Sequence, residues 1–180
     1  MTTIIEEGAL QFSFDKRWNV IKYDEERDYR EKIHKLKDTK AIDFLGTCEN
    51  ELYLLEIKDF RGHRIENQTR LTSEDLVIET AQKVRDTIAG TIGAYRTSSE
   101  SQKWQEFVQY AANPERRIKV MLWLEYELPA HPKARAKVKA SVLSQQLKKA
   151  VRWLTPYAFV AGMNHTALSA YGVSVSNLPK

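Results

Sequence analysis

Three charged residues interrupt two short apolar segments that otherwise have the composition of strands. Asp43 lies inside the segment 40–45, and Glu56 and Lys58 lie inside the segment 52–60. Side chains alternate between the two faces of a strand, so Glu56 and Lys58 are expected on the same face, about 6.6 Å apart along it. A carboxylate in such a place is costly unless a cation compensates it. If the two strands pair, Asp43 joins this pair at one edge of a sheet.

These residue types favour one kind of chemistry. Two neighbouring carboxylates repel each other, and a divalent cation relieves the repulsion; oxygen ligands from Asp and Glu suit Mg²⁺ or Mn²⁺. Such a cation polarises a phosphoryl group and lowers the pKa of a bound water. An adjacent lysine, here Lys58, could orient or deprotonate that water or stabilise charge on the phosphate. The pattern predicts a metal-dependent site for phosphodiester hydrolysis, with Asp43 and Glu56 as metal ligands.

The spacing of these residues also resembles a known signature. Asp43, twelve intervening residues and then Glu56-Ile57-Lys58 resemble the D-x(n)-(D/E)-x-K motif of the PD-(D/E)xK nuclease superfamily, which includes the restriction endonucleases. The resemblance implies a core of helix, three strands, helix and strand, with the acids on the second and third strands. It implies metal ligation by Asp43, Glu56 and the backbone carbonyl of Ile57, and a catalytic role for Lys58. Ile42 stands where the superfamily's name has Pro.

Some members of this superfamily place a further Glu on the first helix. Glu25 and Glu26 are the candidates, since both flank a stripe formed by Tyr29, Ile33 and Leu36 on a helix expected within residues 24–40. Glu26 is the preferred metal ligand because it lies three and seven residues before Tyr29 and Ile33.

The remaining chain predicts alternating strands and helices. A strand is expected at 10–14, and Thr72 or Ser73 is expected to cap the clearest helix. Its apolar positions repeat at spacings of three and four: Val77, Ala81, Val84, Ile88, Ile92 and Tyr95. Further segments are a helix at 102–111, a strand at 118–126, a basic helix at 133–153 and a strand at 167–175. This order predicts an α/β fold with a restriction-endonuclease-like mixed central sheet flanked by helices, in one domain spanning 1–180.

The charge distribution points to a polyanion. The net charge is +4, yet residues 131–180 carry eight Lys and Arg and no acid. Such asymmetry favours a nucleic-acid partner, expected to be DNA, although a solvated helix face is the alternative. Lys83 and Arg85 could contact phosphate, or form ordinary helix ion pairs. The candidate nucleic-acid contacts are Arg61, Arg64, Lys133, Arg135, Lys137, Lys139, Lys148, Lys149 and Arg152.

The composition of the chain limits its expected location and the other functions to be considered. Cys48 is the single cysteine, so no disulfide forms within the chain, and a cytoplasmic location without membrane association is expected. Cutting both strands of a duplex needs two sites, which a homodimer would supply. Two rival hypotheses remain: a catalytically inactive nuclease-fold module that binds nucleic acid or a partner protein, and a structural or regulatory protein.

Overall fold

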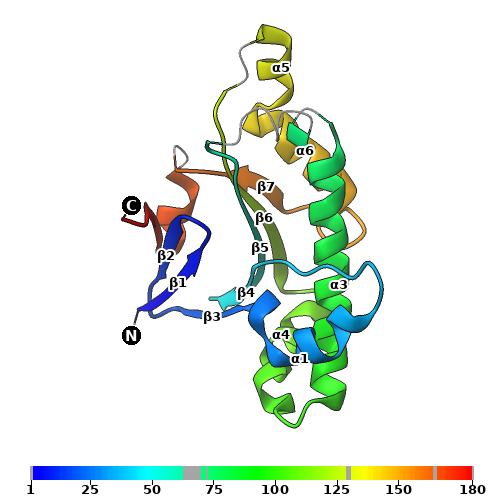
Figure 1. Ribbon diagram of the computed structural model, residues 1–180. Coiled ribbons are helices and arrows are strands. Elements are labelled where there is room, and N and C mark those ends of the chain that lie inside the picture. Colours follow the sequence, from blue (N-terminus) through cyan, green and yellow to red (C-terminus); the bar gives the residue numbers. More distant parts are fainter. Residues whose placement is uncertain (1, 63–69, 72, 129–130, 164–165, 180) are drawn as a thin grey trace.

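A five-stranded mixed sheet lies at the centre of the computed structural model, which describes all residues except 1, 63–69, 72, 129–130, 164–165 and 180 (Figure 1). Its strands lie side by side in the order β3 (Trp18–Lys22), β4 (Phe44–Cys48), β5 (Glu51–Asp59), β6 (Arg117–Glu125) and β7 (Ala158–Ala161). β3, β4 and β5 form an antiparallel meander, whereas β5, β6 and β7 are parallel. β4 therefore runs against the other four strands.

A second, smaller sheet packs against one face of this central sheet. It is antiparallel, with the order β1 (Thr3–Glu7), β2 (Leu10–Phe14) and β8 (Val173–Asn177). Aromatic rings join the two layers: the ring centroid of Phe12 lies 5.2 Å from that of Phe44 and 5.5 Å from that of Trp123. The predicted strand at 10–14 is confirmed as β2.

Helices cover the opposite face of the central sheet. In Figure 1, α3, α4 and α6 lie on one side of the sheet and β1 and β2 on the other. The helices are η1 (Tyr23–Glu25), α1 (Arg27–Glu31), η2 (Ile33–Lys35), α3 (Asp75–Thr97), α4 (Ser101–Ala112), α5 (Pro132–Lys137), α6 (Ala140–Ala150) and η3 (Thr166–Tyr171). The mixed α/β sheet is thus confirmed. In the described part of the chain, no helix is both long and apolar enough to cross a bilayer.

The alternation of side chains along β5 decides which residues face the helices. Leu52 and Leu54 belong to the core under the helices, whereas Tyr53 and Leu55 belong to the core under the smaller sheet. Both faces of β5 are buried, which explains its continuous apolar run. Glu56 follows in the series of Leu52 and Leu54 and therefore projects toward the helix layer.

Helix α3 confirms the clearest helix of the sequence, but its buried face differs from the predicted stripe. Ile92 and Tyr95 are 43% and 38% exposed, while Thr80, Thr87 and Thr91 are buried. The hydroxyls of Thr80 and Thr91 donate to carbonyls four residues earlier, at 2.8 and 2.7 Å. A hydroxyl that is satisfied by the backbone can be buried, and a pattern based on apolar residues does not register it.

Three other predicted boundaries are wrong. Residues 24–40 form the short helices η1, α1 and η2 instead of one helix, and Leu36 is 64% exposed. The basic helix breaks into α5 and α6, because Lys139 has extended ψ near 132°. The last segment splits into η3 and β8. The N-cap of α3 is Glu74, so the predicted cap at Ser73 is wrong by one residue, although Ser73 Oγ accepts from the Asp75 N–H. Thr72 lies outside the described residues.

Gly90→Ala is expected to destabilise the protein by about 1–3 kcal/mol, because overpacking forces neighbours to move. A Cβ at Gly90 would clash with Tyr23 Oη. Tyr23 is 1% exposed and its hydroxyl faces the Thr87 carbonyl, so its ring cannot swing away. Urea unfolding of purified variants measures the change.

Gly93→Ala is the matched control on the same helix. Its added Cβ would meet Ile33 Cδ1 at 3.8 Å, an ordinary contact. Alanine is the better helix former, so this variant should equal or exceed the wild type by up to about 1 kcal/mol. Equal stabilities of the two variants would contradict the close contact between α3 and Tyr23.

Candidate functional site

Asp43 is fixed at the junction of three strands. It directly precedes β4 and is 6% exposed. Its Oδ2 accepts a hydrogen bond from the Ile57 N–H at 2.6 Å, and its carbonyl accepts one from the Tyr23 N–H at 2.8 Å. Phe44 pairs with Leu55 in the ladder, so Asp43 meets β5 at the level of Glu56 and Ile57. The predicted approach of Asp43 to the Glu56 segment is present in the structure.

Glu56 is the most deeply buried acid of the site. Its side chain is 0% exposed, and its Oε1 lies 2.6 Å from Lys58 Nζ and 2.7 Å from Lys83 Nζ. Its Oε2 has no hydrogen-bond partner among the described residues. Burial and then the charge of Asp43 raise the pKa of Glu56 to about 7, and the two ammonium groups offset this in part.

Two lysines provide the positive charge of the site. Lys58 comes from β5 itself, and its Nζ also lies 3.8 Å from Glu79 Oε1. Lys83 comes from α3 and lies 3.8 Å from Asp43 Oδ1. Burial alone would lower the pKa of Lys83, but the charges of Glu56 and Asp43 outweigh it and raise this pKa. Lys83 therefore stays charged and bridges the two predicted metal ligands.

A second acidic group adjoins Asp43. Carboxylate oxygens of Glu7, Asp24 and Asp43 all lie within 4.8 Å of one another. Burial, followed by the charges of Asp43 and Glu7, raises the pKa of Asp24 to about 6, and burial likewise raises that of Asp43. Asp24 Oδ1 is buried and lacks a hydrogen-bond partner among the described residues. These carboxylates are crowded enough to favour either protons or a cation.

Glu26, the acid preferred from the sequence, does not join this group. Its Oε2 lies 2.5 Å from Lys103 Nζ. Asp24 takes the place beside Asp43 because residues 23–25 form η1 at the end of β3, where no continuous helix begins. Apolar and polar residues alternate over Trp18–Asn19–Val20, and this pattern is the signal in the sequence that could have predicted β3. Glu7, contributed by β1 of the smaller sheet, had no signal in the sequence.

Most of the predicted nucleic-acid contacts come from the C-terminal helices and not from the strands that carry these carboxylates. Arg61 binds Asp59 through Nη2–Oδ2 at 2.5 Å and donates to Asn177 at 2.8 Å, so its guanidinium is already paired. Arg85 pairs at 2.8 Å with Asp86, its neighbour in the sequence. Arg64 lies outside the described residues. The remaining predicted cations lie on or beside α5 and α6: Lys133, Arg135, Lys137, Lys139, Lys148, Lys149 and Arg152.

Comparison with known proteins gives one partial similarity. A cysteine–tRNA ligase from Neisseria meningitidis serogroup A is 30% identical over an alignment of 151 residues, and the match covers 69% of this chain and 21% of the ligase. The chain thus spans about a fifth of the length of that relative. No protein-family model matches the chain, and no solved structure matches it. The central sheet with its carboxylates and lysines defines a mixed α/β protein with a charged site between the central strand β5 and helix α3.

Asp24→Asn is expected to stabilise the protein at pH 8 and to have little effect at pH 4. The pKa of Asp24 is raised from 3.8 to about 6 in the fold. The wild type therefore loses stability as pH rises through this window, and the neutral amide does not. After discounting for partial solvent exposure, the gain at pH 8 is about 1–2 kcal/mol.

Urea unfolding at both pH values measures this difference. Glu31→Gln, at an exposed position without an ion pair in the described part of the chain, is the control. A gain for Asp24→Asn that is equal at pH 4 and pH 8 would show that the acid is not under electrostatic strain.

Proposed function

We propose that this chain is a Mg²⁺- or Mn²⁺-dependent nuclease of the PD-(D/E)xK type, which hydrolyses phosphodiester bonds in DNA. The proposal depends above all on the Glu56 carboxylate, which is fully buried and has one oxygen without a partner among the described residues. Such an oxygen is costly to bury. A divalent cation held jointly with Asp43 would satisfy it.

The order of the strands supports the proposed fold family. The resemblance implies three strands, a helix and a fourth strand, with the acids on the second and third strands. β3, β4, β5, α3 and β6 follow this order. Asp43 directly precedes β4, and Glu56 lies on β5. The first helix departs from the expected order, because α1 follows β3 instead of preceding it.

The donor set fits a hard divalent cation. Asp43 and Glu56 would hold it, and the resemblance adds the backbone carbonyl of Ile57. Both side chains supply oxygen atoms, as Mg²⁺ and Mn²⁺ prefer. When bound, the cation would polarise the phosphoryl group and lower the pKa of a bound water. Asp24, in place of Glu26, is the further acid beside Asp43.

The two lysines have different proposed roles. The Lys58 side chain is 18% exposed, and its Nζ lies near both Glu56 and Glu79. It is placed to donate a hydrogen bond to the attacking water or to the phosphate oxygen on which charge develops. Lys83 neutralises Glu56 in the metal-free protein. Because both lysines bind Glu56 Oε1, Lys83 would compete with a metal for this carboxylate.

DNA is the proposed partner beyond the site. The cations of α5 and α6 would neutralise backbone phosphates, which gives sequence-independent and salt-sensitive binding. A homodimer would supply the second site needed to cut a duplex. The partially similar relative is named a cysteine–tRNA ligase, so tRNA belongs among the nucleic acids to be tested.

A second candidate function is a catalytically inactive module of the same fold that binds nucleic acid or a partner protein. The observation in its favour is Lys83, whose ammonium lies 2.7 Å from Glu56 Oε1. Together, Lys58 and Lys83 balance the charges of Asp43 and Glu56, so these two acids have cationic partners within the protein. Metal-dependent cleavage of nucleic acid distinguishes the two candidates, because the nuclease would show it and the inactive module would not.

Lys58→Ala and Asp43→Asn are each expected to lower cleavage about 100-fold or more, the range in which positioned catalytic groups contribute. The assay follows supercoiled plasmid, linear duplex, single-stranded DNA and tRNA with Mg²⁺, Mn²⁺ or EDTA. Lys16→Ala and Glu31→Gln, two exposed positions away from the site, are the controls. The proposed activity would be contradicted if both site variants still cleave DNA. It would also be contradicted if the wild type cleaves none of the substrates.

Lys83→Gln is expected to tighten metal binding several-fold. The substitution removes the ammonium that competes for Glu56 Oε1, and it leaves Lys58 in place. Calorimetric titration with Mn²⁺ measures the affinity directly. An unchanged or weaker affinity would show that Lys83 does not occupy the position of a cation.

A further inference from the structure

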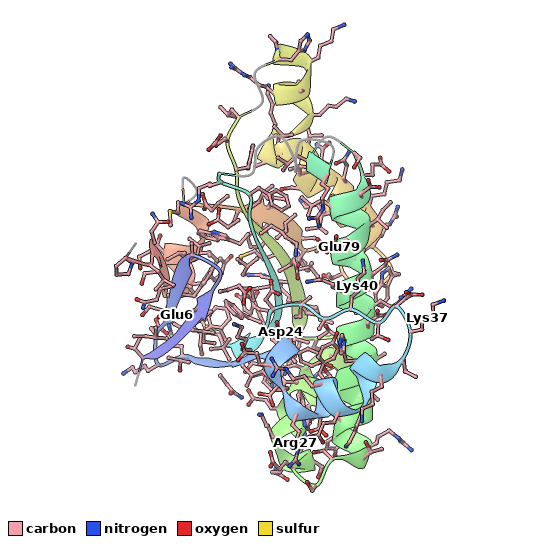
Figure 2. All side chains as sticks on the ribbon, in the orientation of Figure 1. Glu6, Asp24, Arg27, Lys37, Lys40 and Glu79 are labelled. Carbon is pink, nitrogen blue, oxygen red and sulfur yellow. The ribbon has the colours of Figure 1, made fainter. Side chains whose placement is uncertain are left out.

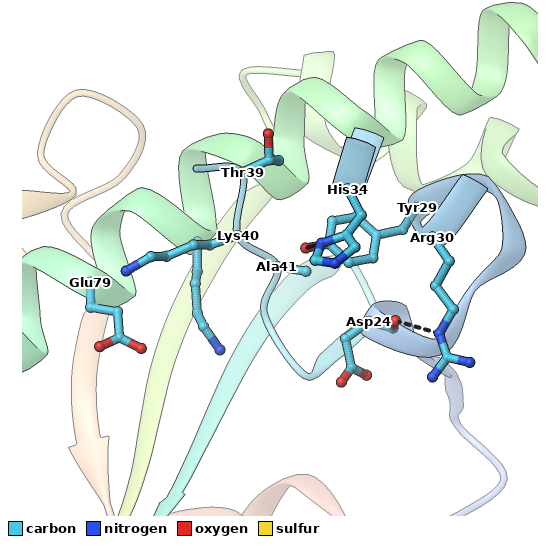
Figure 3. A pocket seen from close by; sticks show the side chains of 9 residues that line it. Asp24, Tyr29, Arg30, His34, Thr39, Lys40, Ala41 and Glu79 are labelled. Atoms are coloured by element: carbon cyan, nitrogen blue, oxygen red, sulfur yellow. Dashed lines mark hydrogen bonds between the residues drawn. The ribbon is translucent and has the colours of Figure 1, made fainter. Parts of the chain in front are cut away.

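A surface pocket of about 670 Å³ adjoins the candidate site. This volume is within the range of ligand-binding pockets. One wall comes from α3, and the other comes from the segment that leads from η1 to β4. The residues that line it are Asp24, Tyr29, Arg30, His34, Thr39, Lys40, Ala41, Glu79 and Lys83 (Figure 3).

The pocket shares two residues with the site. Lys83 contacts Glu56 and approaches Asp43, and Asp24 belongs to the acidic group with Asp43. The pocket therefore adjoins the two proposed metal ligands through Lys83 and Asp24.

The segment that forms the outer wall is held against α3. The Lys40 N–H donates to Asp86 Oδ2 at 3.1 Å, and the Ile42 N–H donates to Thr87 Oγ1 at 3.1 Å. Figure 2 shows this segment, with Lys37 and Lys40, crossing α3. The wall is thus a fixed part of the fold, and its side chains are presented on a defined surface.

Two cations of the pocket form no ion pair among the described residues, although Lys40 is near enough to Glu79 for their charges to interact. Arg30 Nε donates to the Asp24 carbonyl at 3.2 Å, which orients the guanidinium, and no carboxylate pairs with it among the described residues. The Lys40 ammonium likewise forms no ion pair with any described residue. By contrast, Glu79 already binds Arg70 at 2.8 Å. Figure 3 shows Arg30 and Lys40 on either side of Tyr29 and His34.

We propose that Arg30 and Lys40 bind two neighbouring backbone phosphates of the DNA strand next to the bond that is cut. The choice of DNA rests on the proposed nuclease function. Phosphate oxygens are the acceptors that a forked guanidinium and an ammonium bind most strongly. Lys35 and Lys37, exposed on the same segment, extend the positive surface outward. Contacts of this kind position a strand without reading its sequence.

The test is binding of a fluorescent oligonucleotide, single-stranded or duplex, in EDTA, where no cleavage occurs. Arg30→Gln combined with Lys40→Gln is expected to weaken binding about 10-fold and to reduce the slope of log K against log salt by about two. Arg96→Gln combined with Lys16→Gln removes the same charges at exposed positions without ion pairs in the described part of the chain. This control should bind as the wild type does.

Three further arms make the outcome decisive. Arg30→Lys combined with Lys40→Arg keeps both charges and should retain most of the binding, which separates charge from misfolding. Inorganic phosphate at constant ionic strength should compete weakly; competition as strong as that by DNA would assign the pocket to a free anion and overturn the proposal. Wild-type binding by the double Gln variant would overturn it as well.

Cleavage distinguishes failure of this inference from failure of the proposed function. If the wild type cuts DNA and the double Gln variant binds normally, the nuclease stands and the phosphate site is wrong. If the wild type never cuts DNA, and the double Gln variant binds DNA more weakly than the wild type, the phosphate site is supported and the protein is an inactive module.

Discussion

The Glu56 carboxylate cannot be buried in an apolar strand without cations, and the arrangement of this protein follows from that constraint. β5 is covered on both faces, so Glu56 is shielded from water by the helix layer. α3 must approach closely enough for Lys83 to reach Oε1 at 2.7 Å. That approach uses a helix face of threonines and Gly90, where larger side chains would hold the helix away from its neighbours.

The same region contains more negative charge than its lysines neutralise. Asp43 is fixed by the Ile57 N–H, while η1 and the smaller sheet bring Asp24 and Glu7 to within 4.8 Å of it. Burial and mutual repulsion raise the pKa values of Asp24, Asp43 and Glu56. A fold that only needed stability would gain by replacing such acids. Their presence in one cluster beside an open pocket supports the proposed binding of a cation and a polyanion.

The sequence predicted the parts of the site that local patterns encode. Glu56 and Lys58 share a strand, so their common face follows from period-two alternation, and Asp43 follows from the pairing of neighbouring segments. Asp24 and Glu7 could not be predicted in this way, because they arrive through the end of β3 and through a separate sheet. The helical wheel favours Glu26 only for a single helix over residues 24–40, whereas the chain there forms η1, α1 and η2. Lys83 was identified as a cation of α3, but its partner depends on how that helix packs.

Mn²⁺ bound in a crystal tests the central claim most directly. Crystals soaked in Mn²⁺ would be examined by anomalous scattering, which locates the ion without assumptions about activity. The account predicts an anomalous peak coordinated by Asp43 and Glu56, with the Lys83 ammonium displaced from Glu56 Oε1. The contrary result is the absence of a peak at these carboxylates, with Lys83 still paired with Glu56, at Mn²⁺ concentrations well above the physiological range. It would contradict the metal site and favour an inactive module.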